Sequence, residues 1–205
     1  LAHEINQPLT AMRMQLGSLG LLLAKDAPAA VQACLARLAG LLTRMAALTG
    51  HQVCATLHAN SVFGALPRLV EIGLAPELLA GNLTGLLSQR LVRRLCPDCS
   101  RTRPATVTER NRLGLAADAD PPTLHEAAGC PACDFRGYRG RLAITEILPI
   151  DAELDALVAR RAHAAELRAA AGRKGHRSLA EDGVRRVLDG STSLRELARV
   201  VDLSQ

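Results

Sequence analysis

The stretch LLTRMAALTGHQVCATLHAN, residues 41–60, decides the fold of this chain, because two different sequence patterns meet within it. Its first half continues an apolar spacing of three and four residues, which is typical of an amphipathic helix. Its second half, Gln52 to His58, is partly β-branched and ends in a histidine, which predicts a short buried strand. The change of pattern at residues 47–50 therefore predicts that two structural units join there.

The segment before this junction predicts a helical hairpin. Apolar residues recur at helical spacing from Leu9 to Leu23 and again from Val31 to Met45, and a break around Pro28 separates the two runs. Two helices joined by so short a link pack antiparallel. Because such a hairpin leaves one apolar face uncovered, we expect residues 1–47 to form a dimer as a four-helix bundle.

The segment after the junction predicts a mixture of helices and strands. Helices are expected at 61–72, 76–89 and from 151 to the end, and strands at 90–95 and 138–147. Breaks in the last helical region are expected near Gly172–His176 and at Gly190. Residues 100–128 are polar and contain prolines, so they predict a loop with one short helix.

The composition limits the classes of function that fit this chain. The formal net charge is +5, which would suit an acidic partner, but the 205 residues contain only two Phe, one Tyr and no Trp. Since bases stack on aromatic side chains, nucleic acid is not expected as a partner, and a nucleic-acid-binding zinc protein is the weakest of three alternatives. Without an uncharged apolar run of about 18 residues or a signal peptide, we expect a cytoplasmic protein.

Four cysteines form two C-x2-C pairs, which is the spacing typical of a structural zinc site. Both thiolates of one such turn can point at a single ion, and four sulfurs complete a tetrahedron that leaves no position for a catalytic water. The alternatives are two disulfides or four free thiols. The predicted zinc ligands are Cys96, Cys99, Cys130 and Cys133. Cys34 and Cys54 are expected to be small core residues.

The opening LAHEINQPLTAMR, residues 1–13, resembles the phosphoacceptor box of sensor histidine kinases. An exposed imidazole can attack a γ-phosphorus, and a neighbouring carboxylate can accept its proton. The resemblance implies that His3 is the phosphoacceptor, that Glu4 is its base and that Gln7 orients a water in phosphatase chemistry. The simpler alternative is an exposed His–Glu pair on an ordinary helix.

From residue 48 onward the chain resembles the ATPases of type II secretion and type IV pilus assembly, the secretion protein E family. Four segments carry this resemblance, and they occur in the order that the family has. They are TGHQVCATLHANSVFGALPRL (49–69), SQRLVRRLCPDC (88–99), GCPACDFRGYRGRLAITEIL (129–148) and RSLAEDGVRRVLDGSTSLRELARV (177–200). The resemblance implies a histidine box, zinc-binding cysteines, a RecA-like domain, a hexamer and inner-membrane platform proteins as partners.

Two histidines are candidates for contact with ATP. On a continuous strand His51 and His58 are seven residues apart and face opposite sides, so they cannot share a metal ion. His58 ends the predicted strand, where α/β sheets place ligand groups, and is expected to sense phosphate with His51 in support. For either one, the alternative is a hydrogen-bonded structural histidine.

The sequence contains no G-x-x-x-x-G-K-[ST] loop to bind phosphates. The resemblance therefore implies ATP and Mg²⁺ in the intact parent protein only, and predicts a fragment that is inactive alone. The alternative is a histidine phosphotransfer module with a fused zinc-binding domain.

The predicted fold class is α/β and mostly helical, with a helical hairpin followed by a partial RecA-like domain and a tetracysteine zinc subdomain. Four segments are expected: a kinase-like hairpin at 1–47, the histidine-box portion at 48–95, the zinc subdomain at 96–140 and a C-terminal helical region at 141–205. By resemblance, the chain is expected at the inner membrane through its partners.

Overall fold

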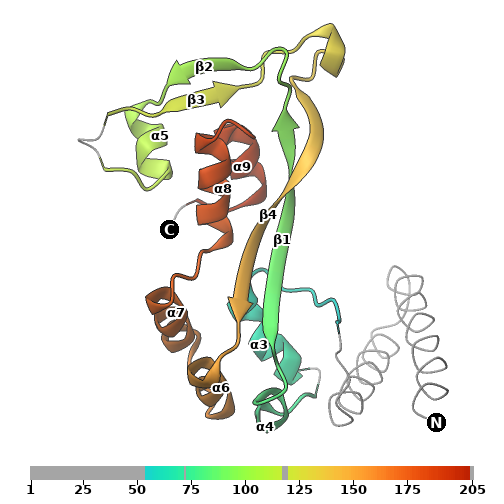
Figure 1. The fold of residues 1–205 in the computed structure, drawn as a ribbon, viewed down its shortest axis with the longest axis vertical. Coiled ribbons are helices and arrows are strands. Elements are labelled where there is room, and N and C mark those ends of the chain that lie inside the picture. Colours follow the sequence, from blue (N-terminus) through green and yellow to red (C-terminus); the bar gives the residue numbers. More distant parts are fainter. Residues whose placement is uncertain (1–53, 72, 117–119, 204–205) are drawn as a thin grey trace, which may run out of the picture.

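The computed structural model describes residues 54–71, 73–116 and 120–203. The predicted hairpin at 1–47 and the candidate residue His51 lie outside these ranges. In the described part, two groups of helices pack at the two ends of one long two-stranded ribbon (Figure 1).

The ribbon consists of β1 (Gly85–Leu95) and β4 (Tyr138–Pro149), which pair antiparallel with a register irregularity between Arg93 and Leu95. Side chains alternate between its faces, as in any strand. Val92 and Ile144 are fully buried on one face. Leu87 and its cross-strand partner Ile147 are more than half exposed on the other. The helices therefore cover one face of the ribbon.

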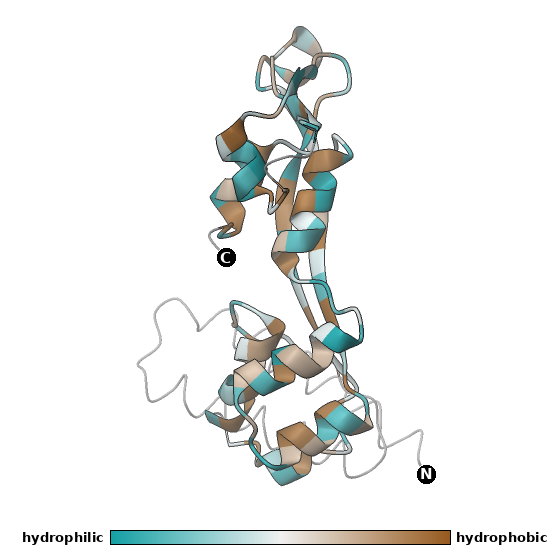
Figure 2. Cartoon of the chain, turned by 90° about the vertical axis from the view of Figure 1, so that its left-hand side faces the viewer, coloured by the Kyte–Doolittle hydropathy of each residue, from teal (hydrophilic) through white to brown (hydrophobic). Residues whose placement is uncertain are grey.

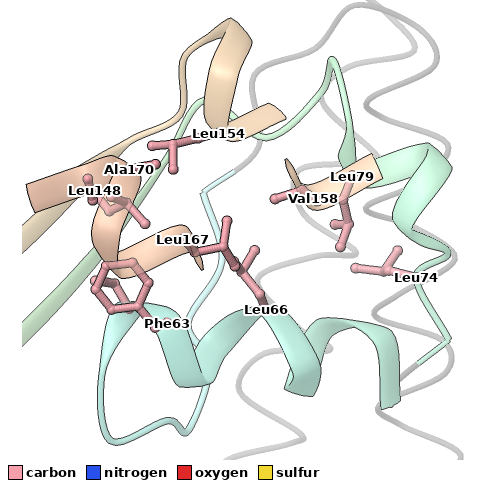
Figure 3. Close-up of a cluster of buried hydrophobic side chains, with 11 residues drawn as sticks. Phe63, Leu66, Leu74, Leu79, Leu148, Leu154, Val158, Leu167 and Ala170 are labelled. Atoms are coloured by element: carbon pink, nitrogen blue, oxygen red, sulfur yellow. The ribbon is translucent and has the colours of Figure 1, made fainter. Parts of the chain in front are cut away.

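A lower cluster of buried apolar side chains surrounds the Gly85–Pro149 end of the ribbon (Figure 3). Phe63, Leu66 and Leu148 belong to it. Side chains cap the N-termini of two of its helices. The Ser61 hydroxyl accepts a hydrogen bond from Gly64 N, and the Asp151 carboxylate accepts one from Leu154 N. The helices are α3 (Val62–Glu71), α4 (Pro76–Leu79), α6 (Ala152–Ala159) and α7 (Ala164–Arg173).

An upper cluster of buried apolar side chains lies at the other end and includes Val92, Ile144, Leu124 and Leu197. Figure 2 shows hydrophobic and hydrophilic residues interspersed along the two upper helices, which lie beside the ribbon. A second antiparallel pair, β2 with β3, lies beside these helices. The elements are β2 (Arg101–Pro104), α5 (Val107–Arg112), β3 (Thr123–Glu126), the 3-10 turn η1 (Pro131–Cys133), α8 (Leu179–Leu188) and α9 (Leu194–Val200).

Most of the predicted elements are confirmed. The helix expected at 61–72 is α3, and the two expected strands lie within β1 and β4. The C-terminal region is helical with the expected breaks near Gly175 and at Gly190. The coarse mixed helix-and-strand class is also confirmed. Across the described ranges, no helix combines the length and the apolar character that crossing a bilayer requires.

Three of the predicted elements are wrong. The helix expected at 76–89 ends at Leu79, because residues 85–89 pair with β4 instead. The loop expected at 100–128 contains the β2–β3 pair besides its short helix α5. The strand expected at 52–58 does not form in its described part, where residues 54–58 have no regular structure.

Candidate metal centre

The four paired cysteines meet at the upper end of the ribbon. Cys96 directly follows β1 and Cys99 lies in the turn after it, while Cys130 directly precedes η1 and Cys133 ends it. The Sγ atoms of Cys96 and Cys130 are 3.9 Å apart, and those of Cys99 and Cys133 are 3.8 Å apart. All four sulfurs lie within 4.8 Å of one another. The folding of the two segments thus gathers the four predicted ligands.

These distances fit a metal ion and not a disulfide. Zinc–sulfur bonds of about 2.3 Å in a tetrahedron place neighbouring sulfurs about 3.8 Å apart. A disulfide would need about 2.05 Å. The Cys130 and Cys133 sulfurs, at 3.8 Å, match the tetrahedral edge as well. The cluster could therefore hold a metal ion such as zinc.

Backbone N–H groups point at the sulfurs and favour their thiolate forms. Cys99 Sγ accepts from Gly129 N at 3.3 Å, and Cys133 Sγ accepts from Gly137 N at 3.1 Å. Burial raises the pKa of the thiols of Cys96, Cys99 and Cys130. Burial also opposes ionisation of Cys133, but the N–H groups of Cys130 and Gly137 outweigh it and lower the pKa of Cys133 to about 7. A bound metal would displace the remaining protons.

Two glycines allow the chain to close around the cluster. Gly129 and Gly137 have φ of +102° and +72°, in the region that favours glycine. A Cβ on Gly129 would lie 2.6 Å from the carbonyl oxygen of Phe135. A Cβ on Gly137 would lie 2.5 Å from the Cβ of Ala127. The backbone can approach this closely around the sulfurs because neither glycine has a side chain.

Replacing Gly137 with alanine is expected to destabilise the chain by about 2 kcal/mol or more, because the new Cβ adds a clash to the cost of a positive φ. Gly140→Ala is the matched control, since Gly140 has φ +79° but a Cβ there would meet no atom of the described residues within 4 Å. Urea unfolding of both variants measures the difference. Equal losses for the two would show that space at Gly137 does not matter.

A surface hollow of about 670 Å³ lies beside the cysteines. Three of the five arginines that line it form ion pairs with carboxylates. Arg103 donates to Glu109 and Glu126, and this contact lowers the pKa of Glu109 to about 2. Arg93 donates to Glu196 and stacks 4.1 Å over the Tyr138 ring. The arginines that line the hollow are Arg93, Arg103, Arg112, Arg136 and Arg195.

Of the other predicted site residues, His58 lies in the described part of the chain, and it is not at this centre. His58 is exposed on an irregular segment next to α3, at the opposite end of the ribbon (Figure 1). His3, Glu4, Gln7 and His51 lie outside the described residues. Cys54 is exposed, so its prediction as a core residue is wrong. The role of each candidate residue stays a prediction.

Sequence reasoning missed three buried carboxylates, of which Glu146 and Glu196 are the least exposed and Asp182 is the third. Glu146, 3% exposed, accepts from Val62 N at 3.4 Å and lies 3.5 Å from His176 Nε2, so it touches the start of α3. Glu196, 1% exposed, accepts from the backbone and the guanidinium of Arg93. A lone acid inside the apolar run AITEIL is the signal that could have found Glu146, whereas Glu196 follows an arginine in SLREL and carries no such signal.

Comparison with known proteins gives one consistent result. The family model described as "Type II/IV secretion system protein" matches residues 41–199. Type II secretion system protein E of Pseudomonas aeruginosa is 44% identical over 155 residues, which cover 76% of this chain and 30% of the relative. Type IV pilus assembly ATPase PilB of Myxococcus xanthus is 43% identical over 157 residues, covering 74% of this chain and 27% of the relative. The chain thus spans less than a third of the length of these relatives.

Proposed function

The chain belongs to the type II/IV secretion system protein family, and from this premise we propose that it is the C-terminal part of an ATPase that powers type II secretion or pilus extension. The observation that carries the proposal is the match over 41–199, which includes the tetracysteine cluster, the segment around His58 and the C-terminal helices. Within the proposal, residues 48–95 belong to a RecA-like domain, 96–140 form a zinc subdomain and 141–205 form the C-terminal helical region.

In this proposal one zinc ion is held by Cys96, Cys99, Cys130 and Cys133. Four sulfur ligands fill a tetrahedral site, so the ion would contribute stability and no bound water for chemistry. Its position at the end of β1 and before β4 would fasten the two strands of the ribbon to each other.

ATP and Mg²⁺ belong to the intact parent protein in this proposal. His58 would sense phosphate there with His51 in support, and a homo-oligomer, by resemblance a hexamer, would complete the site. Platform proteins of the inner membrane are the proposed partners, which would place the chain at the cytoplasmic side of that membrane.

The 205-residue chain is expected not to hydrolyse ATP by itself. Phosphoryl transfer needs a phosphate-binding loop, a lysine and a held Mg²⁺, and the sequence contains no such loop motif. Release of phosphate from ATP by purified chain measures this, with His58→Ala as the control for contaminating enzymes. Turnover above background that His58→Ala abolishes would contradict the proposal.

A second candidate function rests on the opening box LAHEINQPLTAMR, which favours a histidine phosphotransfer module. It lies outside the range that the family model matches. The same samples distinguish the two functions when labelled ATP and the catalytic domain of a related histidine kinase are added. Label that appears on wild type, but not on His3→Ala, would support phosphotransfer through His3.

A further inference from the structure

Glu146 is a buried carboxylate to which the proposed function gives no role. It lies on β4 between Ile144 and Leu148, two buried apolar residues of the face that the helices cover. Burying a carboxylate costs free energy unless hydrogen-bond donors or positive charges surround it. The partners of its two oxygens therefore show what keeps Glu146 in place, and both partners belong to segments outside the ribbon.

One oxygen caps the N-terminus of α3. Val62 N donates to Glu146 Oε2 at 3.4 Å, and Val62 is the first residue of α3, whose N–H has no partner within the helix. The Ser61 hydroxyl caps a different group, Gly64 N. A negative charge is also favourable at this end of a helix. Glu146 thus fixes the start of α3 to β4.

The other oxygen faces a histidine of the C-terminal region. Glu146 Oε1 lies 3.5 Å from His176 Nε2, which is buried and has no hydrogen-bond partner among the described residues. Two acceptors would repel each other here, so we assign the ring proton that faces the carboxylate to Nε2. The imidazole ring also packs edge-on against Phe63, with 5.2 Å between the ring centroids. His176 therefore contacts both the capping residue and the helix that it caps.

The end of α7 places His176 in this position. Gly175 has φ +78°, and His176 N donates to Ala171 O at 3.1 Å, which is the hydrogen bond of a Schellman turn. A second residue of α7, Arg168, places its guanidinium carbon 5.5 Å from the centroid of the Phe63 ring. Helix α7 and the turn that ends it thus hold the first turn of α3 from the side opposite to solvent-exposed His58.

We propose that Glu146 and His176 are positioning residues for His58. His58 lies four residues before Val62, so the place where α3 begins limits where His58 is presented. Glu146 and His176 fasten this start to α7, and a movement of α7 is passed on to His58. The inference rests on the proposed role of His58 as phosphate sensor, and it adds a link from that residue to the C-terminal helical region.

Nuclear magnetic resonance of the full 205-residue chain tests this link through hydrogen exchange at the Val62 amide and backbone order parameters at 58–61. In wild type the Val62 amide should exchange at least about tenfold more slowly than in an unstructured peptide. Glu146→Ala should speed its exchange about tenfold and lower the order parameters. Glu146→Gln keeps an oxygen for Val62 N and offers an N–H to His176, so both readouts should stay within about twofold of wild type.

Glu196→Gln is the matched control, because Glu196 is also a buried carboxylate that accepts a backbone N–H from another element, at the opposite end of the ribbon. It should change neither readout, although it lowers stability. His176→Ala, which leaves the acceptor of Val62 N in place, should lower the order parameters at 58–61. It keeps the test decisive even where Glu146→Ala does not fold.

A wild-type Val62 amide that exchanges as fast as in an unstructured peptide would overturn the proposal. Equal changes in Glu146→Ala and Glu196→Gln would do so as well, because loss of stability alone would then explain them, and so would unchanged order parameters in His176→Ala. Neither readout uses ATP. Hydrolysis of ATP by the chain would therefore contradict the proposed function without altering these results, so the two failures are distinguishable.

Discussion

Replacing Cys130 with serine is expected to abolish tight zinc binding and to loosen residues 95–140. The Cys130 sulfur lies 3.9 Å from that of Cys96 and 3.8 Å from that of Cys133, so it joins the two cysteine pairs. A hydroxyl is a poor replacement for a thiolate ligand, and the free energy of structural zinc binding is largely free energy of folding. A loss of about 4 kcal/mol or more in this region is expected.

Zinc content and hydrogen exchange measure these two effects. Cys54→Ser is the matched control, because it makes the same chemical change at an exposed cysteine outside the cluster. It should keep one zinc per chain and unchanged exchange at 95–140. Wild-type protein that contains no zinc after purification under reducing conditions, without a chelator, would contradict the proposed centre.

The second large effect is expected at Glu196, whose side chain joins α9 to β1. Burial raises the pKa of this carboxyl, but hydrogen bonds from Arg199 and Arg93 outweigh it and lower the pKa to about 2. The ordinary pKa of a glutamate, which applies to the unfolded chain, is 4.5. The carboxylate therefore stabilises the fold fully above pH 4.5, by an amount on the order of 3 kcal/mol, and this contribution disappears as the pH falls towards 2.

Glu196→Gln should thus cost on the order of 3 kcal/mol at pH 7, and less at pH 3, where the wild type has lost part of the same contribution. Urea unfolding of both proteins at each pH gives the difference between their free energies of unfolding. The contributions of the other titrating groups are the same in both proteins and cancel in this difference. Glu71→Gln removes an exposed pair with Arg68 and should change stability little at any pH. A cost of Glu196→Gln that does not depend on pH would show that the charge of Glu196 is unimportant.

The cysteine cluster could be predicted from the sequence because ligand spacing is a local property. Two residues between cysteines fix the turn at Cys96–Cys99 and at Cys130–Cys133, whatever the rest of the fold does. The sequence could not show that the two turns meet through the pairing of β1 with β4. That contact joins parts of the chain far apart in the sequence.

The segment 85–89 shows why local patterns fail. Its residues GLLSQ include good helix formers, so the pattern predicts a helix. In the structure Leu86 packs against the lower cluster and Leu87 pairs with Ile147 of β4. Tertiary pairing thus overrides propensity. The buried Glu196 was missed for the same reason, since only the folded chain brings Arg93 to it.

The hydrogen bond from Cys96 N to Gly137 O, at 3.0 Å, shows where the two strands of the ribbon rejoin after the long excursion between them. For the unfolded chain, bringing Leu95 next to Tyr138 means closing that entire loop, at a cost in conformational entropy. A metal ion bound by the two cysteine pairs would close the loop in the same event. The residues of β1 and β4 could then pair one after another, starting next to the cysteines. Each step would bring together residues that are already close, as in the formation of a short hairpin.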